Sequence, residues 1–224
     1  MPSLQDAIQI MVRDAAKLAQ GTRTVGLGSG STAAKIVKEL ANLKDDRMVF
    51  VPTSTQIKIE AEKNNLAIAD ENRIPKIDIV FDGADQIDGG FNMIKGGGGA
   101  LLREKILISS AKRVVILADE SKFVKQFSRP VPIEIHPMAR SSASRKLVEA
   151  GGRPSLRILD KGYPFITENG NLILDTAFAS IKDPRAKEIE LKSIPGVMEV
   201  GIFTRKADVF YKAKNDGTFQ KITT

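Results

Sequence analysis

Short apolar segments alternate with amphipathic ones along the first half of the chain, and this alternation constrains the fold more than any other feature. The apolar segments are predicted strands at 24–27, 48–51, 77–81 and 113–118. They are short and apolar on both faces, as expected of parallel strands that are covered by helices. We therefore expect an α/β fold here, with a doubly wound, mostly parallel sheet.

The segments between these strands have the periodicity of helices. Apolar residues at helical spacing predict an opening helix from Leu4 to Leu18, which Gly21 ends. Ser31 and Thr32 are predicted to cap a second helix that runs through Leu40. Two further helices are predicted at 53–64 and 100–110.

The pattern changes near Pro130 and Pro132. Strands and helices then follow at 131–135, 141–150, 164–166, 172–174, 184–191 and 197–200. Two strand–helix–strand passes of similar length predict a smaller α+β domain of split βαβ, ferredoxin-like type, inserted near the C-terminus. The last stretch holds two strands around the Asn215-Asp216-Gly217 turn and is predicted to return to the first domain. We expect an α/β catalytic domain at 1–130 plus 205–224 and the small domain at 131–204.

Composition narrows the possible chemistry. The 224 residues include no cysteine, which excludes disulfides, thiolate catalysis and thiolate metal ligands and fits a cytoplasmic location. No apolar run approaches the roughly 20 residues that span a bilayer. The first residues, with Asp6 and Arg13 in an amphipathic pattern, lack the features of a signal peptide. We therefore expect no contact with a membrane.

The net charge of +7 leaves nucleic-acid binding as an alternative. Lys and Arg are spread along the whole chain, aromatic residues make up only 5%, and there is no Trp, so no base-stacking platform is evident. A basic protein that acts on a phosphorylated small molecule accounts for the charge equally well. We expect such a molecule, and no nucleic acid, as the partner.

Residues 26–32, Gly-Leu-Gly-Ser-Gly-Ser-Thr, lie between a predicted strand and a predicted helix. Glycines allow a tight turn that points N–H groups at an anion, and the helix N-terminus and hydroxyls add donors. No Lys precedes the Ser and Thr as in a P-loop, and the third glycine has the wrong spacing for the dinucleotide fingerprint. The segment predicts a phosphate cradle, with a glycine-rich turn and helix cap as the alternative.

Asp82 and Asp85 stand at the end of a buried strand. Carboxylates there are costly unless they are paired, hydrogen-bonded or part of a site. Their functions would be to bind sugar hydroxyls or to transfer protons, and magnesium or calcium binding is the alternative. The spacing matches no calcium loop, and Asp88 beside two glycines is typical of a turn. We expect no metal site.

Four consecutive glycines follow Lys95 and precede a predicted helix that carries Glu104. The glycines allow a ligand to approach the backbone closely. Glu104 is a candidate base, with a simple interaction with the helix dipole as the alternative. Lys122 follows the strand at 113–118 and could reach a phosphate, although a lone loop lysine is usually surface. The only histidine, His136, precedes Pro137 and is interpreted as a non-catalytic loop residue.

All four segments are predicted at the carboxyl edge of the sheet, where open α/β sheets bind ligands. In this order they resemble the A-type ribose-5-phosphate isomerases, whose motifs include G-x-G-[ST]-G-S-T, D-G-A-D-[EQ]-[IV], K-G-G-G-[GA]-A-x-x-R-E-K and A-D-x-S-K. Further family segments match Pro137-Met138-Ala139-Arg140, Gly151-Gly152-Arg153-Pro154 and Ile194-Pro195-Gly196-Val197. The resemblance covers nearly the whole chain.

The resemblance implies interconversion of ribose 5-phosphate and ribulose 5-phosphate in the non-oxidative pentose phosphate pathway, through an enediolate and without metal or cofactor. It implies that Glu104 is the base that moves the proton between the first and second carbons, and that Lys95 stabilises the oxyanion. Asp82 and Asp85 would hold the sugar hydroxyls, and one of them would assist ring opening. The remaining implied substrate contacts are Ser29, Gly30, Ser31, Thr32 and Lys122 at the phosphate, together with Gly83, Ala84, Gly96, Gly97 and Gly98.

The chain departs from the family pattern at a few positions. Ser29 stands where Thr is common, and Gln86 where Glu is common. Some members place a phosphate-binding Lys in the opening helix, but the first Lys here is Lys17, so that helix is left out of the site. Because members are commonly dimers or tetramers, we expect a homodimer or homotetramer.

Two alternative functions compete with this interpretation. One is a related sugar-phosphate enzyme or coenzyme A transferase of the same fold, since a fold does not fix a function. The other is a non-catalytic sugar-phosphate sensor coupled to DNA binding. No helix-turn-helix segment is visible at either end of the chain, which disfavours the sensor.

Overall fold

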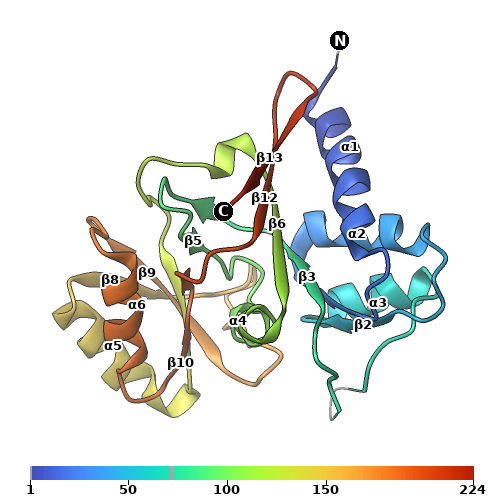
Figure 1. The fold of residues 1–224 in the computed structure, drawn as a ribbon. Helices are drawn as coiled ribbons and strands as arrows, with labels where there is room; N and C mark the ends of the chain where they lie inside the picture. The colour runs from blue at the N-terminus through green and yellow to red at the C-terminus, as the bar shows by residue number, and fades with distance from the viewer. Residues whose placement is uncertain (1, 71–72) are drawn as a thin grey trace. The chain divides into compact units, whose positions relative to one another are not determined.

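The computed structural model describes residues 2–70 and 73–224 (Figure 1). They form two compact units, of which the first comprises Met1–Ala84, Arg103–Lys122 and Ala207–Thr224 and the second Asp85–Leu102 and Phe123–Lys206. Residues 85–102 and 123–130 therefore pack with the second unit, whereas the boundaries predicted from the sequence assign them to the larger domain.

The first unit is built on a six-stranded sheet in the order β13-β12-β6-β3-β1-β2. Its strands are β1 (Thr24–Leu27), β2 (Val49–Pro52), β3 (Ile79–Asp82), β6 (Arg113–Asp119), β12 (Val209–Ala213) and β13 (Phe219–Thr223). All neighbouring strands are parallel except the β12–β13 hairpin. The predicted mostly parallel α/β sheet is confirmed.

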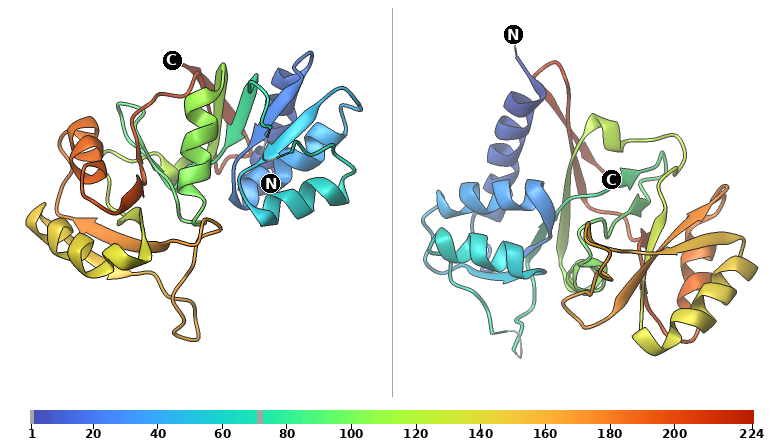
Figure 2. Two further views of the ribbon diagram at one scale, coloured as in Figure 1. Left: turned by 90° about the horizontal axis from the view of Figure 1, so that it is seen from below. Right: turned by 180° about the vertical axis from the view of Figure 1, so that it is seen from behind.

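Helices cover both faces of this sheet (Figure 2). On one face, α1 (Leu4–Ala16), α2 (Gly30–Ala41) and α3 (Thr55–Lys63) bury an apolar core against the sheet. On the other face, α4 (Leu101–Ser110) approaches β1 at a glycine: a Cβ added at Gly26 would lie 3.3 Å from Leu107 Cδ1. Helices on both faces explain why the strands are apolar at successive positions.

The second unit contains a four-stranded antiparallel sheet in the order β10-β7-β9-β8. Its strands and helices follow as β7 (Val131–Ile135), α5 (Arg140–Glu149), β8 (Gly152–Leu156), β9 (Leu172–Phe178), α6 (Pro184–Lys192) and β10 (Val197–Val200). This βαββαβ succession is the predicted split βαβ arrangement. Ala143 and Leu147 of α5 and Leu191 of α6 are buried with inward-facing strand residues in one core.

Two sequence predictions fail in this unit. The predicted strand at 164–166 forms only isolated bridges, from Pro164 to Ile158 and from Ile166 to Leu172. The strand β8 was not predicted, because Gly152 and Pro154 are typical of turns. β8 is an edge strand, where a proline that donates no ladder hydrogen bond is tolerated.

A three-stranded sheet in the order β11-β5-β4 completes the second unit. Its strands are only two residues long: β4 (Gln86–Ile87), β5 (Met93–Ile94) and β11 (Ile202–Phe203). Such short strands carry no periodicity, so the sequence did not predict them. They place Asp85 directly before β4 and Lys95 directly after β5.

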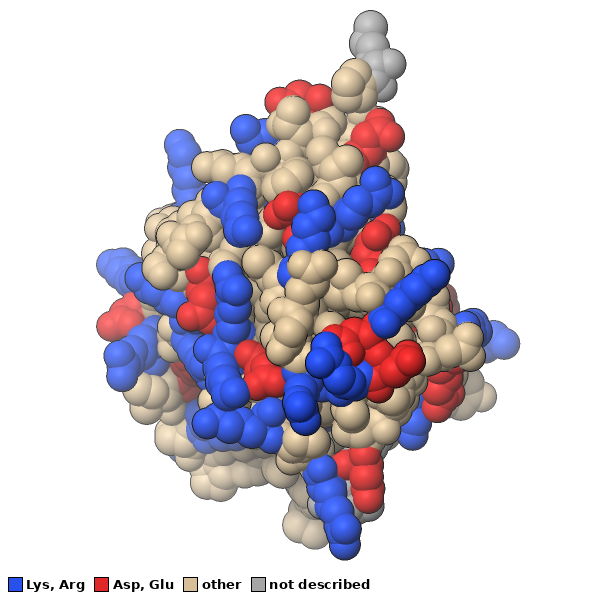
Figure 3. Space-filling view, turned by 45° about the vertical axis from the view of Figure 1, so that its right-hand side comes forward, with Lys and Arg blue, Asp and Glu red and all other residues tan. Residues whose placement is uncertain are grey.

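Among the described residues, no helix is long and apolar enough to cross a membrane. Lys and Arg side chains are scattered over the face drawn in Figure 3, with Asp and Glu between them.

Candidate functional site

The strands β1 and β3 end side by side where the order of the first unit's sheet reverses. After β1 the chain adds β2 on one side, and it later adds β3, β6 and β12 on the other. Leu27 pairs with Phe81, and the Gly28 N–H donates to the Phe81 carbonyl at 2.8 Å. Ligands of open α/β sheets bind at such a switch point, beyond the carboxyl ends of the strands.

Asp82 lies against the backbone of Gly28 at this point. A Cβ added to Gly28 would stand 1.9 Å from Asp82 Oδ1, so only glycine leaves room for the carboxylate. Asp82 is 1% exposed, and its Oδ1 accepts a 2.7 Å hydrogen bond from the Gly83 N–H. The structure thus joins two of the segments that the sequence analysis selected.

Glu104 belongs to the first turn of α4 and is 2% exposed. Its Oε1 accepts a hydrogen bond of 2.6 Å from Ser29 Oγ. Such short bonds are typical of a hydroxyl that donates to a carboxylate. The bond joins the glycine-rich loop to the candidate base across 75 positions of sequence.

The predicted cap of α2 is wrong. The N-cap is Ser29 instead of Ser31 or Thr32, and the helix begins at Gly30, whose φ is +87°. Because Ser29 Oγ turns to Glu104, no described side chain caps the first N–H groups of α2. An uncapped helix N-terminus of this kind suits an anion. Ser31 and Thr32 lie in its first turn.

Lys122 ends the 3₁₀-helix η2 (Glu120–Lys122), which follows β6. Since β6 neighbours β3, the lysine lies at the same edge of the sheet as Asp82. It is half-buried. Gly83 and Ala84, which close the first unit's part of the predicted site, are half-buried as well.

In the second unit, Asp85 contacts the glycine loop, defined here as residues 96–99. The Gly97 N–H donates to Asp85 Oδ2 at 2.8 Å, and a Cβ on Gly97 would lie 2.7 Å from Oδ1. The Asp85 N–H donates to the Ile94 carbonyl at 2.8 Å, which fixes the carboxylate at the base of the short hairpin.

Lys95 is 3% exposed, which is rare for a lysine. Its backbone N–H donates to the Gly201 carbonyl at 2.9 Å, and its Nζ lies 5.6 Å from the centroid of the Phe203 ring. The ring face attracts the ammonium group and keeps it at the end of β5. Gly96, Gly97 and Gly98 follow directly.

Sequence reasoning missed two residues that contact the glycine loop, Arg157 and Phe165, and the Asp175 carboxylate that pairs with Arg157. No motif marks them, because Arg157 is 61 positions from Gly96 and the other two lie farther along the chain, so the group assembles only in the folded unit. His136 was expected to be non-catalytic. It caps the 3₁₀-helix η3 (Pro137–Ala139), with Nδ1 accepting from the Met138 N–H.

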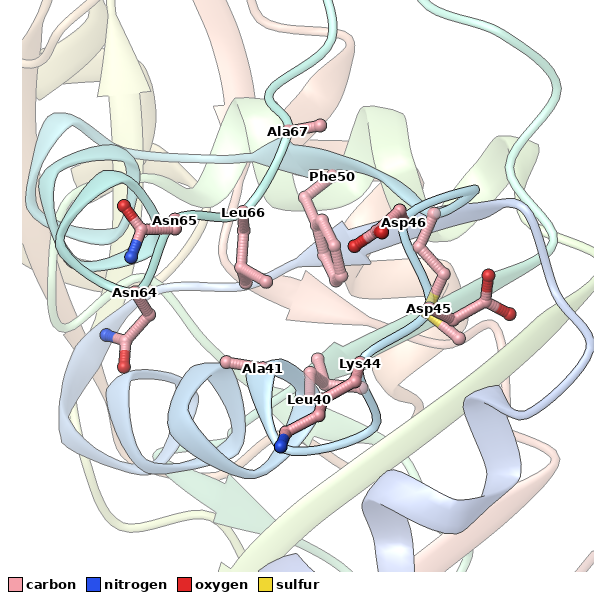
Figure 4. A pocket seen from close by; sticks show the side chains of 11 residues that line it. Leu40, Ala41, Lys44, Asp45, Asp46, Phe50, Asn64, Asn65, Leu66 and Ala67 are labelled. Atoms are coloured by element: carbon pink, nitrogen blue, oxygen red, sulfur yellow. The ribbon is translucent and has the colours of Figure 1, made fainter.

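Two cavities mark the units. In the second unit a cavity of about 260 Å³ is bounded by Asp85, Gly97, Arg129 and Arg157, among others. In the first, a cavity of about 500 Å³ lies between the C-terminal ends of α2 and α3 and the start of β2, with Leu40, Phe50 and Leu66 among its lining (Figure 4). None of the predicted site residues lines the cavity of the first unit. Within the described residues, no group of three or more His, Asp or Glu is arranged to hold a metal ion.

Comparisons with known proteins point in one direction. The family model of ribose 5-phosphate isomerase A (phosphoriboisomerase A) matches residues 49–217. Ribose-5-phosphate isomerase A of Methanosarcina acetivorans is 43% identical over 213 residues, which are 93% of this chain and 91% of that protein. The Haloarcula marismortui protein of the same name is 41% identical, covering 94% and 93%.

Solved structures agree. A D-ribose-5-phosphate isomerase in complex with phospho-erythronic acid superposes with a TM-score of 0.93 at 36% identity, covering 100% of both chains. Ribose 5-phosphate isomerase A of Methanocaldococcus jannaschii gives a TM-score of 0.91 at 35% identity, covering 99% of this chain and 100% of that one.

Proposed function

Because the chain belongs to the ribose 5-phosphate isomerase A family, it is an aldose–ketose isomerase of ribose 5-phosphate and ribulose 5-phosphate, and we propose that Glu104 is its base. One observation carries this assignment. Glu104 is a buried carboxylate at the carboxyl edge of the sheet, oriented by the 2.6 Å hydrogen bond from Ser29. A base must be held in place before its reactivity matters.

The proposed reaction moves one proton between neighbouring carbons. In the open-chain aldose, Glu104 takes the proton from the second carbon, and the electrons of that C–H bond form the double bond to the first carbon. The carbonyl electrons pass to the oxygen, which gives an enediolate. The protonated Glu104 then returns the proton to the first carbon, while the hydroxyl proton of the second carbon passes to the negative oxygen on the first carbon and the second carbon becomes the ketone.

Lys95 would stabilise the negative oxygen of the enediolate. Its burial favours this role, because a cation has a stronger effect on a developing charge where water is excluded. Asp82 and Asp85 would accept hydrogen bonds from the sugar hydroxyls, and one of them would assist ring opening. The backbone of Gly83, Ala84, Gly96, Gly97 and Gly98 would complete the contacts to the sugar.

The phosphate would bind at the uncapped N-terminus of α2, where Gly30, Ser31 and Thr32 supply N–H and hydroxyl donors. Lys122 would add a positive charge at the neighbouring strand end. The Ser29 hydroxyl already donates to Glu104, so we assign its side chain to the base and its backbone to the phosphate loop.

A related isomerase has been solved with phospho-erythronic acid, and we propose that this compound also binds here. Its carboxylate resembles the planar, negatively charged end of the enediolate. Reaction without metal or cofactor, assembly as a homodimer or homotetramer, and a cytoplasmic location stay predictions.

The test is conversion of ribose 5-phosphate to ribulose 5-phosphate by purified protein in EDTA. Wild-type protein should turn over, and Glu104→Gln should lose about 10²–10⁴-fold in kcat while still binding phospho-erythronic acid. Glu149→Gln, at a glutamate whose side chain is 62% exposed, is the matched control. Near-wild-type activity in Glu104→Gln would remove the base from the proposal, and activity that requires added magnesium would contradict the metal-free mechanism.

A further inference from the structure

The carbonyl groups of the glycine loop are held by a guanidinium group from elsewhere in the second unit. Arg157 Nη1 donates to the Gly96 carbonyl at 2.9 Å and to the Gly97 carbonyl at 3.1 Å. Two successive peptide units therefore present their oxygens to one side chain. No sequence motif and no role proposed above accounts for this contact.

Arg157 is itself fixed by a bidentate ion pair. Its Nε donates to Asp175 Oδ2 at 2.8 Å and its Nη2 to Asp175 Oδ1 at 2.5 Å. The Arg157 N–H also donates to the Ile173 carbonyl at 2.9 Å, which ties the residue to β9 beside Asp175. The Arg157 side chain is only 15% exposed. A fork held in this way keeps its third nitrogen in one direction.

Phe165 supports both the arginine and the loop. Arg157 Cζ lies 5.7 Å from the centroid of the Phe165 ring. A Cβ on Gly99 would stand 2.4 Å from Phe165 Cζ, so the ring packs directly on that glycine, whose φ is +83°. Arg157 and the Phe165 ring therefore both contact the glycine loop and restrict its conformation.

These contacts set the direction of the loop's N–H groups. In a trans peptide the C=O and N–H point in opposite directions. The Gly96–Gly97 unit gives its oxygen to Arg157 and its N–H to Asp85. The Gly97–Gly98 unit also gives its oxygen to Arg157, so the Gly98 N–H points away from the guanidinium. Gly97 and Gly98 are both exposed and can meet a ligand.

We propose that Arg157 is a positioning residue of the isomerase reaction: it orients the glycine loop so that the Gly98 N–H and the Asp85 carboxylate are presented to the sugar. The N–H then donates to the anionic oxygen that develops in the enediolate. This inference rests on the proposed function of the glycine loop. Donors aimed at a developing charge act mainly in the transition state, so loss of the alignment should lower kcat more than it raises KM.

The variant Arg157→Lys separates positioning from stability. Lysine keeps a positive charge beside Asp175, but it lacks the planar fork that binds the carboxylate and both carbonyls together. We expect Arg157→Lys to unfold within a few degrees of wild type and to lose about tenfold or more in kcat, with a KM change of less than about threefold. Arg157→Met should lose more kcat than Arg157→Lys, which gives a graded response.

Arg47→Lys is the matched control. Arg47 forms the same kind of bidentate pair with Asp45, at 2.8 Å for both contacts, but it lies in the first unit at an exposed turn. The Arg47→Lys variant should therefore have the kcat and KM of wild type. Wild type and Glu104→Gln are measured in the same assay. The difference between them tests whether Glu104 is the base, whereas the Arg157 variants test only whether Arg157 positions the glycine loop.

The proposal is overturned if folded Arg157→Lys and Arg157→Met both keep kcat within twofold of wild type. It is also overturned if KM rises while kcat stays unchanged, because the loop would then contribute only to ground-state binding. Arg157→Met leaves the Asp175 carboxylate without its cationic partner, and this variant can fail to fold for that reason. In that case Arg157→Lys alone decides between these outcomes.

Discussion

The two units hold their predicted site residues in different ways. In the first unit, Asp82 and the glycine-rich loop meet because two neighbouring parallel strands end at the same edge, and a backbone hydrogen bond from Gly28 to Phe81 continues the strand pairing into the loop. In the second unit, the glycine loop follows a two-residue strand, and the side chains of Arg157 and Phe165 hold it.

This difference indicates which positions of each unit should tolerate substitution and which should not. A site fixed by strand ends depends on backbone proximity, so its most sensitive positions should be those where a glycine makes room. A loop fixed by side chains depends on those side chains, which the chemistry itself does not use. The following predictions test this contrast, beginning with the largest expected effect.

Gly28→Ala should be the most damaging small substitution in the first unit. The added methyl would stand 1.9 Å from Asp82 Oδ1, so the carboxylate must leave its position. A displacement of about 1 Å at a reacting group can cost about 10²-fold in rate. Steady-state kinetics should show at least this loss in kcat/KM. Gly89→Ala, where a methyl meets nothing within 4 Å, is the control and should retain activity.

Gly99→Ala tests the second unit in the same way. Its φ of +83° and the Phe165 ring 2.4 Å from the added Cβ both oppose alanine. We expect about a tenfold loss in kcat, because the loop moves without displacing the base. Gly99→Ala combined with Phe165→Leu should recover part of that loss by making space. If the double variant is no better than the single one, the contact with Phe165 does not position the loop.

Ser29→Ala removes the donor that orients Glu104. A hydrogen bond to a carboxylate is worth about 1.5–3 kcal/mol. Only the part of that energy that acts in the transition state lowers kcat, so kcat should fall by up to about tenfold. Ser29→Thr retains the hydroxyl and should stay close to wild type in the same kinetic assay. Equal activity of the alanine and threonine variants would show that the bond has no role in turnover.

Asp78→Asn should change stability without changing turnover, since Asp78 precedes β3 at the edge away from the site. Hydrogen bonds from Lys112 and then from the Arg23 and Thr24 N–H groups lower the pKa of Asp78 to about 2. A lowered folded-state pKa stabilises the protein above the unfolded value near 4, and this contribution disappears as the pH falls toward 2.

Thermal unfolding at neutral and acid pH checks this smallest effect. With allowance for solvent screening, the contribution of Asp78 at pH 7 should be on the order of 1–2 kcal/mol. The Tm difference between wild type and Asp78→Asn should therefore be largest near neutral pH and shrink from pH 4 to pH 2. A difference that is independent of pH would show that the charge of Asp78 does not stabilise the fold.

The sequence predicted the features that are encoded locally. The fold class, the order of strands and helices in the first half and the placement of residues 26–32 and Asp82 at strand ends follow from apolar periodicity and glycine spacing. Glu104 was found because it stands five positions after the last of four consecutive glycines within a specific motif. These signals lie within a few residues of one another.

The remaining features depend on contacts between distant positions. The Ser29 hydroxyl donates to the Glu104 carboxylate, 75 positions away in sequence. Ser29 is also the N-cap residue of α2, where the sequence predicted Ser31 and Thr32. Arg157 donates to the Gly96 carbonyl across 61 positions of sequence. It directly follows β8, which was not predicted because its glycine and proline are typical of turns. Neither pairing leaves a pattern along the chain, so no reading of periodicity could find it.

Exchange of the transferred proton with solvent tests the central claim most directly. Ribose 5-phosphate would be incubated with wild type and Glu104→Gln in D₂O with EDTA, and deuterium at the first and second carbons measured by NMR. The account predicts that wild type incorporates deuterium during turnover and that Glu104→Gln incorporates almost none, although it is folded and binds phospho-erythronic acid. Incorporation by Glu104→Gln at the wild-type rate would contradict the assignment of Glu104 as the base.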